Sequence, residues 1–263
     1  NEVIIHPTAI VSPKAELGKS VKIGAFSIIE DDVIIGDNTE IRSSVVIANG
    51  ARIGKDCKIF SHAVIATEPQ DLKYEGEVTF VFIGDRNVIR EYATINRATK
   101  ETGKTIIGND NLFMAYTHVA HDCILGNNII MANVAQIAGH VQIEDWAIFG
   151  AYSKIHQFCT VGSHSMLAAG VKIVKDVPPY VLIGREPAKI EGINKIGLRR
   201  RGFSVEIIDE IERFYHIILY SGLNNKDGIA EYSKKENIPD EIKNCIYFIE
   251  NSKRGIQIIR WKL

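Results

Sequence analysis

Two histidines, an aspartate and a cysteine lie close together in the stretch AYTHVAHDCILG (115–126). These residues are His118, His121, Asp122 and Cys123. Imidazole and thiolate groups are zinc ligands, whereas an imidazole beside a carboxylate is the arrangement that orients a general base. Spacing alone leaves both chemistries open, so the choice depends on the elements that position these side chains.

The chain around this stretch repeats every six residues. From Ile5 to Ile173 every sixth residue is apolar, except within two polar segments. The next residue is often glycine, where we expect a tight corner that needs it. The fourth residue after each apolar one is usually small or β-branched. Cys57, Cys123 and Cys159 occupy this same position of the repeat, which we call the inward slot.

An α-helix cannot keep a six-residue period on one face. Short strands joined by tight corners and coiled as a parallel β-helix explain the pattern. The repeat resembles that of the hexapeptide-repeat acyltransferases, in which three hexads form one triangular coil. The resemblance implies a mainly β fold with a left-handed parallel β-helix, although the general rule for parallel crossovers favours the opposite hand.

We assign residues 1–190 to the β-helix, with two loops leaving it at about 69–82 and 99–106. The two prolines that follow Val177 cannot continue a hydrogen-bonded ladder, so the regular coils should end there. The segment GREPAKIEG (184–192) is then expected to be a connector.

Residues 191–263 change character and are expected to form a small α-helical domain. Ser204 is a suitable N-cap for a helix that Gly222 closes. A second helix is expected at about 226–236, and Pro239 suits the first turn of a third. The helices should cover one open end of the β-helix.

Net charge, apolar run length and cysteine count exclude several classes of protein. The net charge is −1 over 263 residues, which argues against a nucleic-acid-binding protein. No apolar run approaches the ~20 residues of a transmembrane segment, and we expect none. Four scattered cysteines without a CxxC motif fit a reducing compartment, so we expect a cytoplasmic protein.

An 18-residue coil decides which residues can stack. Residues i and i+18 then lie about 4.8 Å apart, so His121 stacks with Gly139 and Gln157. The neighbouring His140 and His156 fall on the same edge. Three coils together therefore place polar groups along one strip.

Zinc is the weaker interpretation of the opening stretch. Cys123 is in the inward slot, where it should pack in the core. His118 and His121 are three apart in extended chain and should point to different sides. We expect no metal, and keep as an alternative a zinc enzyme similar to the γ-carbonic anhydrases. A non-catalytic scaffold or ice-binding solenoid is disfavoured because the outward slots are varied and charged.

Motifs outside the repeat are more specific. The chain resembles the UDP-N-acetylglucosamine O-acyltransferase family, which starts lipid A synthesis, over essentially its whole length. The motifs that carry this resemblance are QDLKYEGE (70–77), IGDRNVIRE (83–91), HVAHDC (118–123), AGHV (138–141), HQFC (156–159), DVPPYV (176–181) and GLRRRGFS (197–204).

The resemblance implies a mechanism. His121 would be the general base for the glucosamine 3-hydroxyl, and the Gly139 N–H would stabilise the oxyanion. Asp122 would orient His121, although adjacent residues of a strand face opposite ways. No acyl-enzyme is needed. No cofactor belongs to the protein, because the acyl carrier protein brings its own phosphopantetheine.

The resemblance also implies the substrate contacts. They are Gln70, Asp71, Lys73, His118, His140, His156, Gln157, Asn194, Arg200 and Arg201. Asn96 and Ile196 depart from the family pattern, which often has histidine and an acidic residue there. Both departures leave details of nucleotide-sugar contact open.

The implied partners are UDP-N-acetylglucosamine and an acyl carrier protein. The acidic carrier suits a basic surface, for which Lys172, Lys175 and Arg185 are candidates. The small residues at 168–170 lie where an acyl chain could pass. The family pattern also implies a homotrimer with active sites between subunits. Another hexapeptide-repeat sugar acyltransferase is the alternative function.

Overall fold

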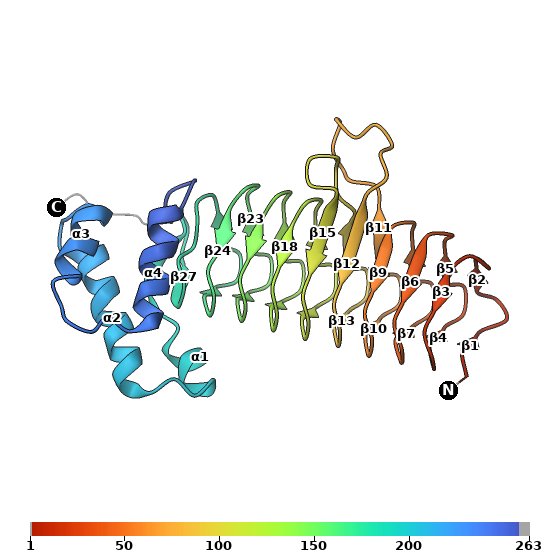
Figure 1. Cartoon of the computed structure of the whole chain (residues 1–263), viewed down its shortest axis with the longest axis horizontal. Helices are drawn as coiled ribbons and strands as arrows, with labels where there is room; N and C mark the ends of the chain where they lie inside the picture. The colour runs from red at the N-terminus through yellow and green to blue at the C-terminus, as the bar shows by residue number, and fades with distance from the viewer. Residues whose placement is uncertain (1, 258–263) are drawn as a thin grey trace.

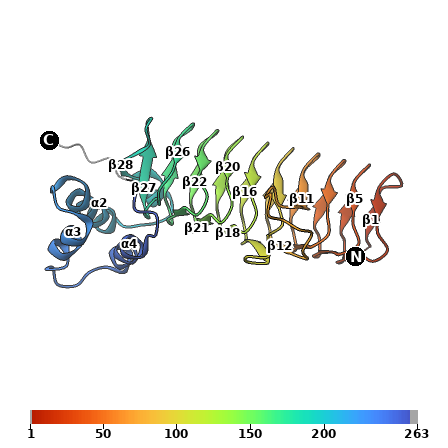
Figure 2. The same ribbon diagram turned by 90° about the horizontal axis from the view of Figure 1, so that it is seen from above.

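The computed structural model describes residues 2–257 (Figure 1). It is a left-handed parallel β-helix with a group of helices at its C-terminal end (Figures 1 and 2). Each coil contributes one short strand to each of three sheets, so strands three apart in the chain are hydrogen-bonded neighbours. The predicted fold class is confirmed.

The three sheets within residues 2–257 are named A, B and C. Sheet A contains β1 (Ile4–Ile5), β4 (Lys22–Ile23), β7 (Glu40–Ile41), β10 (Lys58–Ile59), β13 (Val88–Ile89), β16 (Leu112–Phe113), β19 (Ile130–Met131), β22 (Ile148–Phe149), β25 (Met166–Leu167), β27 (Val181–Gly184) and β28 (Lys189–Ile193). Sheet B contains β2 (Ile10–Val11), β5 (Ile28–Ile29), β8 (Val46–Ile47), β11 (Val64–Thr67), β14 (Thr94–Asn96), β17 (His118–Val119), β20 (Gln136–Ile137), β23 (Lys154–Ile155) and β26 (Lys172–Ile173). Sheet C contains β3 (Glu16–Leu17), β6 (Val33–Ile35), β9 (Ala51–Ile53), β12 (Phe80–Ile83), β15 (Lys104–Ile107), β18 (Ile124–Leu125), β21 (Gln142–Ile143) and β24 (Thr160–Val161).

The corners between strands use left-handed backbone at non-glycine residues. Asp122 (φ 62°), His140 (φ 59°) and Phe158 (φ 63°) are stacked corner residues between sheets B and C. We call this corner the B–C edge, and the one between sheets C and A the C–A edge. Register follows the expected 18-residue coil, since Val119 pairs with Ile137.

Glycine after the apolar residue has a different reason from the one expected. Gly108 lies outside the left-handed region. A Cβ there would come within 2.4 Å of the Gly126 carbonyl oxygen in the next coil. Close approach of successive coils therefore excludes a side chain.

The inward slots form one continuous core along the prism. Ile65, Ile137 and Leu167 are fully buried, and so is Cys123 in the predicted inward slot. Interiors of this kind are close-packed, so the coils form a rigid support for side chains at the corners.

Two loops leave the β-helix at residues 68–79 (loop 1) and 97–103 (loop 2), on the same side of the prism (Figure 1). They are shorter than expected. β12 (Phe80–Ile83) and β15 (Lys104–Ile107), which the predicted loops partly included, pair with each other and continue sheet C.

The predicted end of the ladder near Val177 was wrong. β27 pairs in parallel with β25, matching Leu167 with Ile183. The two prolines lie before β27, where no ladder N–H is needed. The predicted connector was also wrong, because β27 and β28 form an antiparallel pair.

Four helices follow within the described residues: α1 (Lys195–Arg200), α2 (Val205–Tyr220), α3 (Asn225–Tyr232) and α4 (Asp240–Asn251). Ser204 caps α2, accepting from the Ile207 N–H as predicted. Helix α1 was not predicted. β28 crosses the boundary that we placed at residue 190, and residues 258–263 of the second unit lie outside the described part. None of the helices described here is long and apolar enough to cross a membrane.

Candidate active site

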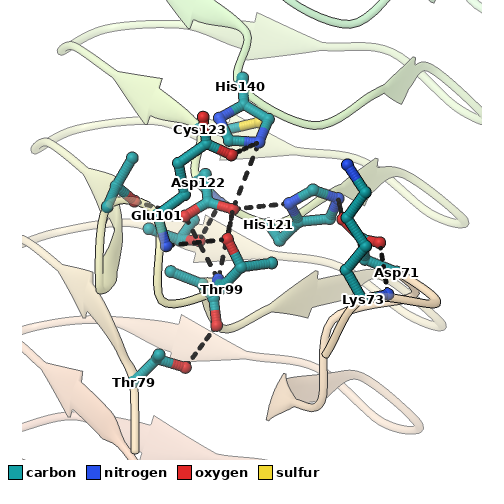
Figure 3. A network of polar contacts seen from close by, with 12 residues as sticks. Asp71, Lys73, Thr79, Thr99, Glu101, His121, Asp122, Cys123 and His140 are labelled. Atoms are coloured by element: carbon teal, nitrogen blue, oxygen red, sulfur yellow. Dashed lines mark hydrogen bonds and ion pairs between the residues drawn. The ribbon is translucent and has the colours of Figure 1, made fainter. Parts of the chain in front are cut away.

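Residues of both loops lie beside His121 at the B–C edge (Figure 3). Side chains of the loops and of this edge line a cavity of about 240 Å³. The edge contributes His121, His140, Gln157 and Phe158. Loop 1 contributes Asp71, Lys73 and Glu77, and loop 2 contributes Thr99, Lys100 and Glu101. Segments far apart in sequence therefore meet on one rigid edge.

His121 and Asp122 are paired although they are adjacent. Nδ1 of His121 lies 2.7 Å from Oδ2 of Asp122 (Figure 3). The expectation that strand neighbours face opposite ways does not apply, because both residues form a corner and not a strand. The left-handed backbone of Asp122 allows its carboxylate to turn back to the imidazole.

Asp122 is buried and has many donors. Its carboxylate accepts from the Thr99 hydroxyl at 2.8 Å, the Thr99 N–H at 3.2 Å and the Thr102 hydroxyl. Burial raises the pKa of Asp122, but the hydrogen bonds from His121, Thr102 and Thr99 outweigh it and hold that pKa at about 2. The carboxylate is therefore ionised at neutral pH.

This charge state fixes the tautomer of His121. An ionised carboxylate can only accept hydrogen bonds, so Nδ1 must carry the proton. In the neutral imidazole, Nε2 then keeps its lone pair. Oδ2 of Asp71 lies 3.9 Å from Nε2, which is beyond hydrogen-bond distance. The arrangement is that of an oriented general base.

Gly139 lies directly against the His121 ring. A Cβ at Gly139 would come within 2.6 Å of Cε1 of His121. No backbone carbonyl among residues 2–257 accepts from the Gly139 N–H.

His140 borders the same ring edge-on, with centroids 5.2 Å apart, and stacks on Phe158 at 4.5 Å. Its Nε2 lies 3.4 Å from the Glu101 carboxylate.

The predicted substrate-binding residues fall into groups. Asp71, Lys73, His140 and Gln157 line the cavity, whereas Gln70 and His156 are exposed outside its lining. His118 lies on sheet B, with Nδ1 2.7 Å from the Thr94 hydroxyl. Burial lowers the pKa of His118, and the nearby His121 adds to this effect.

Asn194, Arg200 and Arg201 are not brought to this cavity. Asn194 is buried, caps α1 and donates to the His164 carbonyl oxygen at 3.0 Å. Arg201 lies over the Trp146 ring at 5.1 Å, on the C–A edge. Arg200 is exposed. One chain thus presents two separated groups.

The two positions that depart from the family pattern differ in environment. Asn96 is buried and donates to the Thr67 hydroxyl at 3.1 Å. Ile196 is exposed on α1.

The zinc set of His118, His121 and Cys123 does not assemble. Cys123 is fully buried, donates to the Ala138 carbonyl oxygen, and burial raises its pKa to about 12. A different trio, His121, Asp122 and His140, has ligand atoms within 4.8 Å of one another in the described chain. Oδ2 of Asp122 already accepts from His121 and Thr99, so these atoms orient a base instead of leaving an open coordination site.

Sequence reasoning missed Thr99, Thr102 and Phe158. The two threonines stand in the polar loop sequence TKETGKTI, which marked a loop but not its hydrogen-bond partner. Phe158 follows the corner period of six, which gives its position but not its stacking on His140.

Known proteins match nearly the whole chain. The acyl-[acyl-carrier-protein]–UDP-N-acetylglucosamine O-acyltransferase of Herminiimonas arsenicoxydans is 46% identical, over 96% of this chain and 98% of its own. The chain belongs to the UDP-N-acetylglucosamine O-acyltransferase family. The family model described as UDP N-acetylglucosamine O-acyltransferase, domain 2, matches residues 176–257, and a bacterial transferase hexapeptide model matches 14–49.

Solved structures of UDP-N-acetylglucosamine O-acyltransferases agree. The acyltransferase of Bacteroides fragilis is 47% identical with a TM-score of 0.95, covering 98% of this chain and 100% of its own. The Arabidopsis acyltransferase has a TM-score of 0.86 at 32% identity, with 97% and 100% covered. The resemblance inferred from the motifs is confirmed.

Proposed function

We propose that the chain transfers a 3-hydroxyacyl group from acyl carrier protein to the glucosamine 3-hydroxyl of UDP-N-acetylglucosamine. The observation that carries this proposal is the imidazole of His121, which lines a cavity and is oriented through Nδ1 by ionised Asp122, with Nε2 outside hydrogen-bond distance of Asp71. Family membership supplies the two substrates. The step would begin lipid A biosynthesis in the cytoplasm.

The reaction balances without a covalent enzyme intermediate. Nε2 takes the proton of the sugar hydroxyl as its oxygen attacks the thioester carbonyl. The Gly139 N–H donates to the oxyanion of the tetrahedral intermediate. Collapse releases the carrier thiolate, which takes the proton from the imidazolium. Burial raises the pKa of Cys123 to about 12 and that of Cys159 to about 11, so neither suits a nucleophile.

The sugar nucleotide is proposed to lie across two copies of the chain. Asp71 and Lys73 line the cavity, and Gln70, His118, His140, His156 and Gln157 complete the sugar and pantetheine contacts. Asn194, Arg200 and Arg201 lie elsewhere on the chain and would reach the diphosphate and nucleoside from a neighbouring copy. A homotrimer with sites between subunits meets this requirement. A fully active monomer in sedimentation would contradict it.

A groove of about 350 Å³ supports a path for the carrier's arm. It shares His140 and Phe158 with the catalytic cavity and runs between sheet C and α4 to Lys253 and Arg254. Polar side chains such as Thr160 suit amides, and the two cations suit a phosphate. The carrier brings phosphopantetheine itself, so the proposed reaction uses no cofactor bound by the protein.

Product analysis tests the proposal directly. Purified protein is incubated with UDP-N-acetylglucosamine and 3-hydroxyacyl carrier proteins of several chain lengths, and the nucleotide is analysed by mass spectrometry. The expected product is a mono-acylated sugar nucleotide. His121→Ala should abolish it, while His216→Ala, at an exposed histidine of α2, is the matched control. No product at any chain length would refute the proposal.

A further inference from the structure

Loop 1 carries a carboxylate to the free nitrogen of the base, although the loop has no regular secondary structure of its own. Asp71 faces Nε2 of His121, while Asp122 binds Nδ1 (Figure 3). A contact of this kind requires that the loop be held in place. We infer that Arg97 is a positioning residue that fixes loop 1 and thereby Asp71. The kinetic part of this inference rests on the proposed function.

Arg97 ties together the start and the middle of loop 1. Its Nη1 donates to the Ala66 carbonyl oxygen at 3.0 Å, just before the loop. Its Nη2 donates to the Tyr74 hydroxyl at 2.7 Å, and the guanidinium lies over the Tyr74 ring at 5.6 Å. The backbone N–H of Arg97 donates to the Thr67 carbonyl oxygen at 3.0 Å. The side chain is only 15% exposed, so these contacts are shielded from water.

Tyr74 passes this constraint to Asp71. The Tyr74 N–H donates to the Asp71 carbonyl oxygen at 3.0 Å. The Lys73 N–H donates to Oδ1 of Asp71 at 2.9 Å, which leaves Oδ2 directed to His121. The Tyr74 hydroxyl also donates to the Glu77 carbonyl oxygen. The Tyr74 ring therefore connects the partly buried Arg97 guanidinium to the turn that presents the Asp71 carboxylate.

Other ties join the end of loop 1 to loop 2 or are exposed. The buried Thr79 hydroxyl donates to the Ala98 carbonyl oxygen, and the Lys100 N–H donates to the Glu77 carboxylate at 3.0 Å. Lys100 and Glu75 form an ion pair at 3.1 Å, but their side chains are 66% and 77% exposed. Exposed pairs contribute about 0–1 kcal/mol. Glu68 lies 3.7 Å from Arg97 and is also exposed. The partly buried contacts of Arg97 are thus the tie that reaches Tyr74, whose N–H donates to the Asp71 carbonyl oxygen.

The chemistry explains why this position matters. When Nε2 gains the sugar proton, the imidazolium lies between two carboxylates. A shift of Asp71 by about 1 Å changes that stabilisation and the place of the sugar, and such misplacement can cost about 100-fold in rate. Lysine cannot replace arginine here, because the planar guanidinium of Arg97 donates to two separate acceptors and also lies over the Tyr74 ring.

The kinetic test uses Arg97→Ala, Arg97→Lys and Tyr74→Phe. Arg97→Ala should lower kcat/KM about 100-fold, and Arg97→Lys should not restore it. Tyr74→Phe should lower it about tenfold. The matched control is Arg86→Ala, which removes an exposed arginine paired with Asp110 on the C–A edge. Arg97→Ala or Tyr74→Phe activity equal to that control would overturn the inference.

A double-mutant cycle separates positioning from a general structural effect. If Arg97 acts through Asp71, adding Arg97→Ala to Asp71→Ala should cause no further loss. Losses that multiply would refute the inference.

A second readout needs no substrate. Tryptic cleavage after Lys73 should be faster in Arg97→Ala and in Tyr74→Phe, with unchanged circular dichroism, and unchanged cleavage in both would refute the inference. Absence of acyl transfer by the wild-type chain would count against the proposed function alone.

Discussion

Replacing Asp122 with asparagine removes one charge while keeping the volume of the side chain. In the folded chain the carboxylate holds His121 by a 2.7 Å hydrogen bond and is itself held by Thr99 and Thr102. An asparagine can place its oxygen toward His121, with its NH2 toward Thr102. It can also place NH2 toward His121, which moves the imidazole proton to Nε2 and blocks the base.

Both orientations remove the anion that stabilises the imidazolium. Two unit charges about 4 Å apart interact by about 4 kcal/mol at an effective dielectric of 20. That energy corresponds to a loss of about 1,000-fold in kcat, since each 1.36 kcal/mol is a factor of ten. The orientation with the wrong tautomer raises the loss to about 10,000-fold. We expect kcat to fall within this range, with KM for the sugar nucleotide nearly unchanged.

The assay is steady-state acyl transfer with both substrates varied, together with thermal unfolding of the same preparations. Asp110→Asn is the matched control, because Asp110 is an exposed carboxylate paired with Arg86. A kcat for Asp122→Asn within about tenfold of wild type, in a folded protein, would refute the assigned role of Asp122.

Other consequences of the geometry can be measured separately. Gly139→Ala should lower kcat at least about 100-fold, because a Cβ 2.6 Å from the catalytic imidazole displaces it; unchanged kinetics would contradict that contact. Native protein should resist alkylation by iodoacetamide at Cys123, whose pKa burial raises to about 12, and mass spectrometry would detect a rapid adduct. Gly108→Ala should destabilise the fold by about 1–3 kcal/mol in urea titrations, because the added Cβ meets backbone of the next coil. The folded-state pKa of Asp122 is depressed from 3.8 to about 2, so its contribution of about 2 kcal/mol is present above pH 4 and is lost as pH falls toward 2. The stability gap between wild type and Asp122→Asn should close over that range, and a constant gap would contradict the shift.

Much of the fold follows from local pattern. The six-residue period from Ile5 to Ile173 specifies which side chains face inward, because each short strand presents one residue to the core. It correctly placed Cys123 inside. The N-cap at Ser204 could also be predicted from local sequence, because it requires only a side-chain hydroxyl and the first turn of the helix that follows. The short helix α1 has no such strong pattern and was missed.

The sequence by itself determined the coil, its period and the family to which the chain belongs. It could not decide the pairing of His121 with Asp122, because strand geometry predicts opposite faces and only the left-handed corner brings the two together. Nor could it find the donors Thr99 and Thr102 or the hold of Arg97 on loop 1. Those contacts join residues about twenty positions apart through loops. Their geometry depends on how successive coils and loops pack in three dimensions, and no local periodicity encodes it.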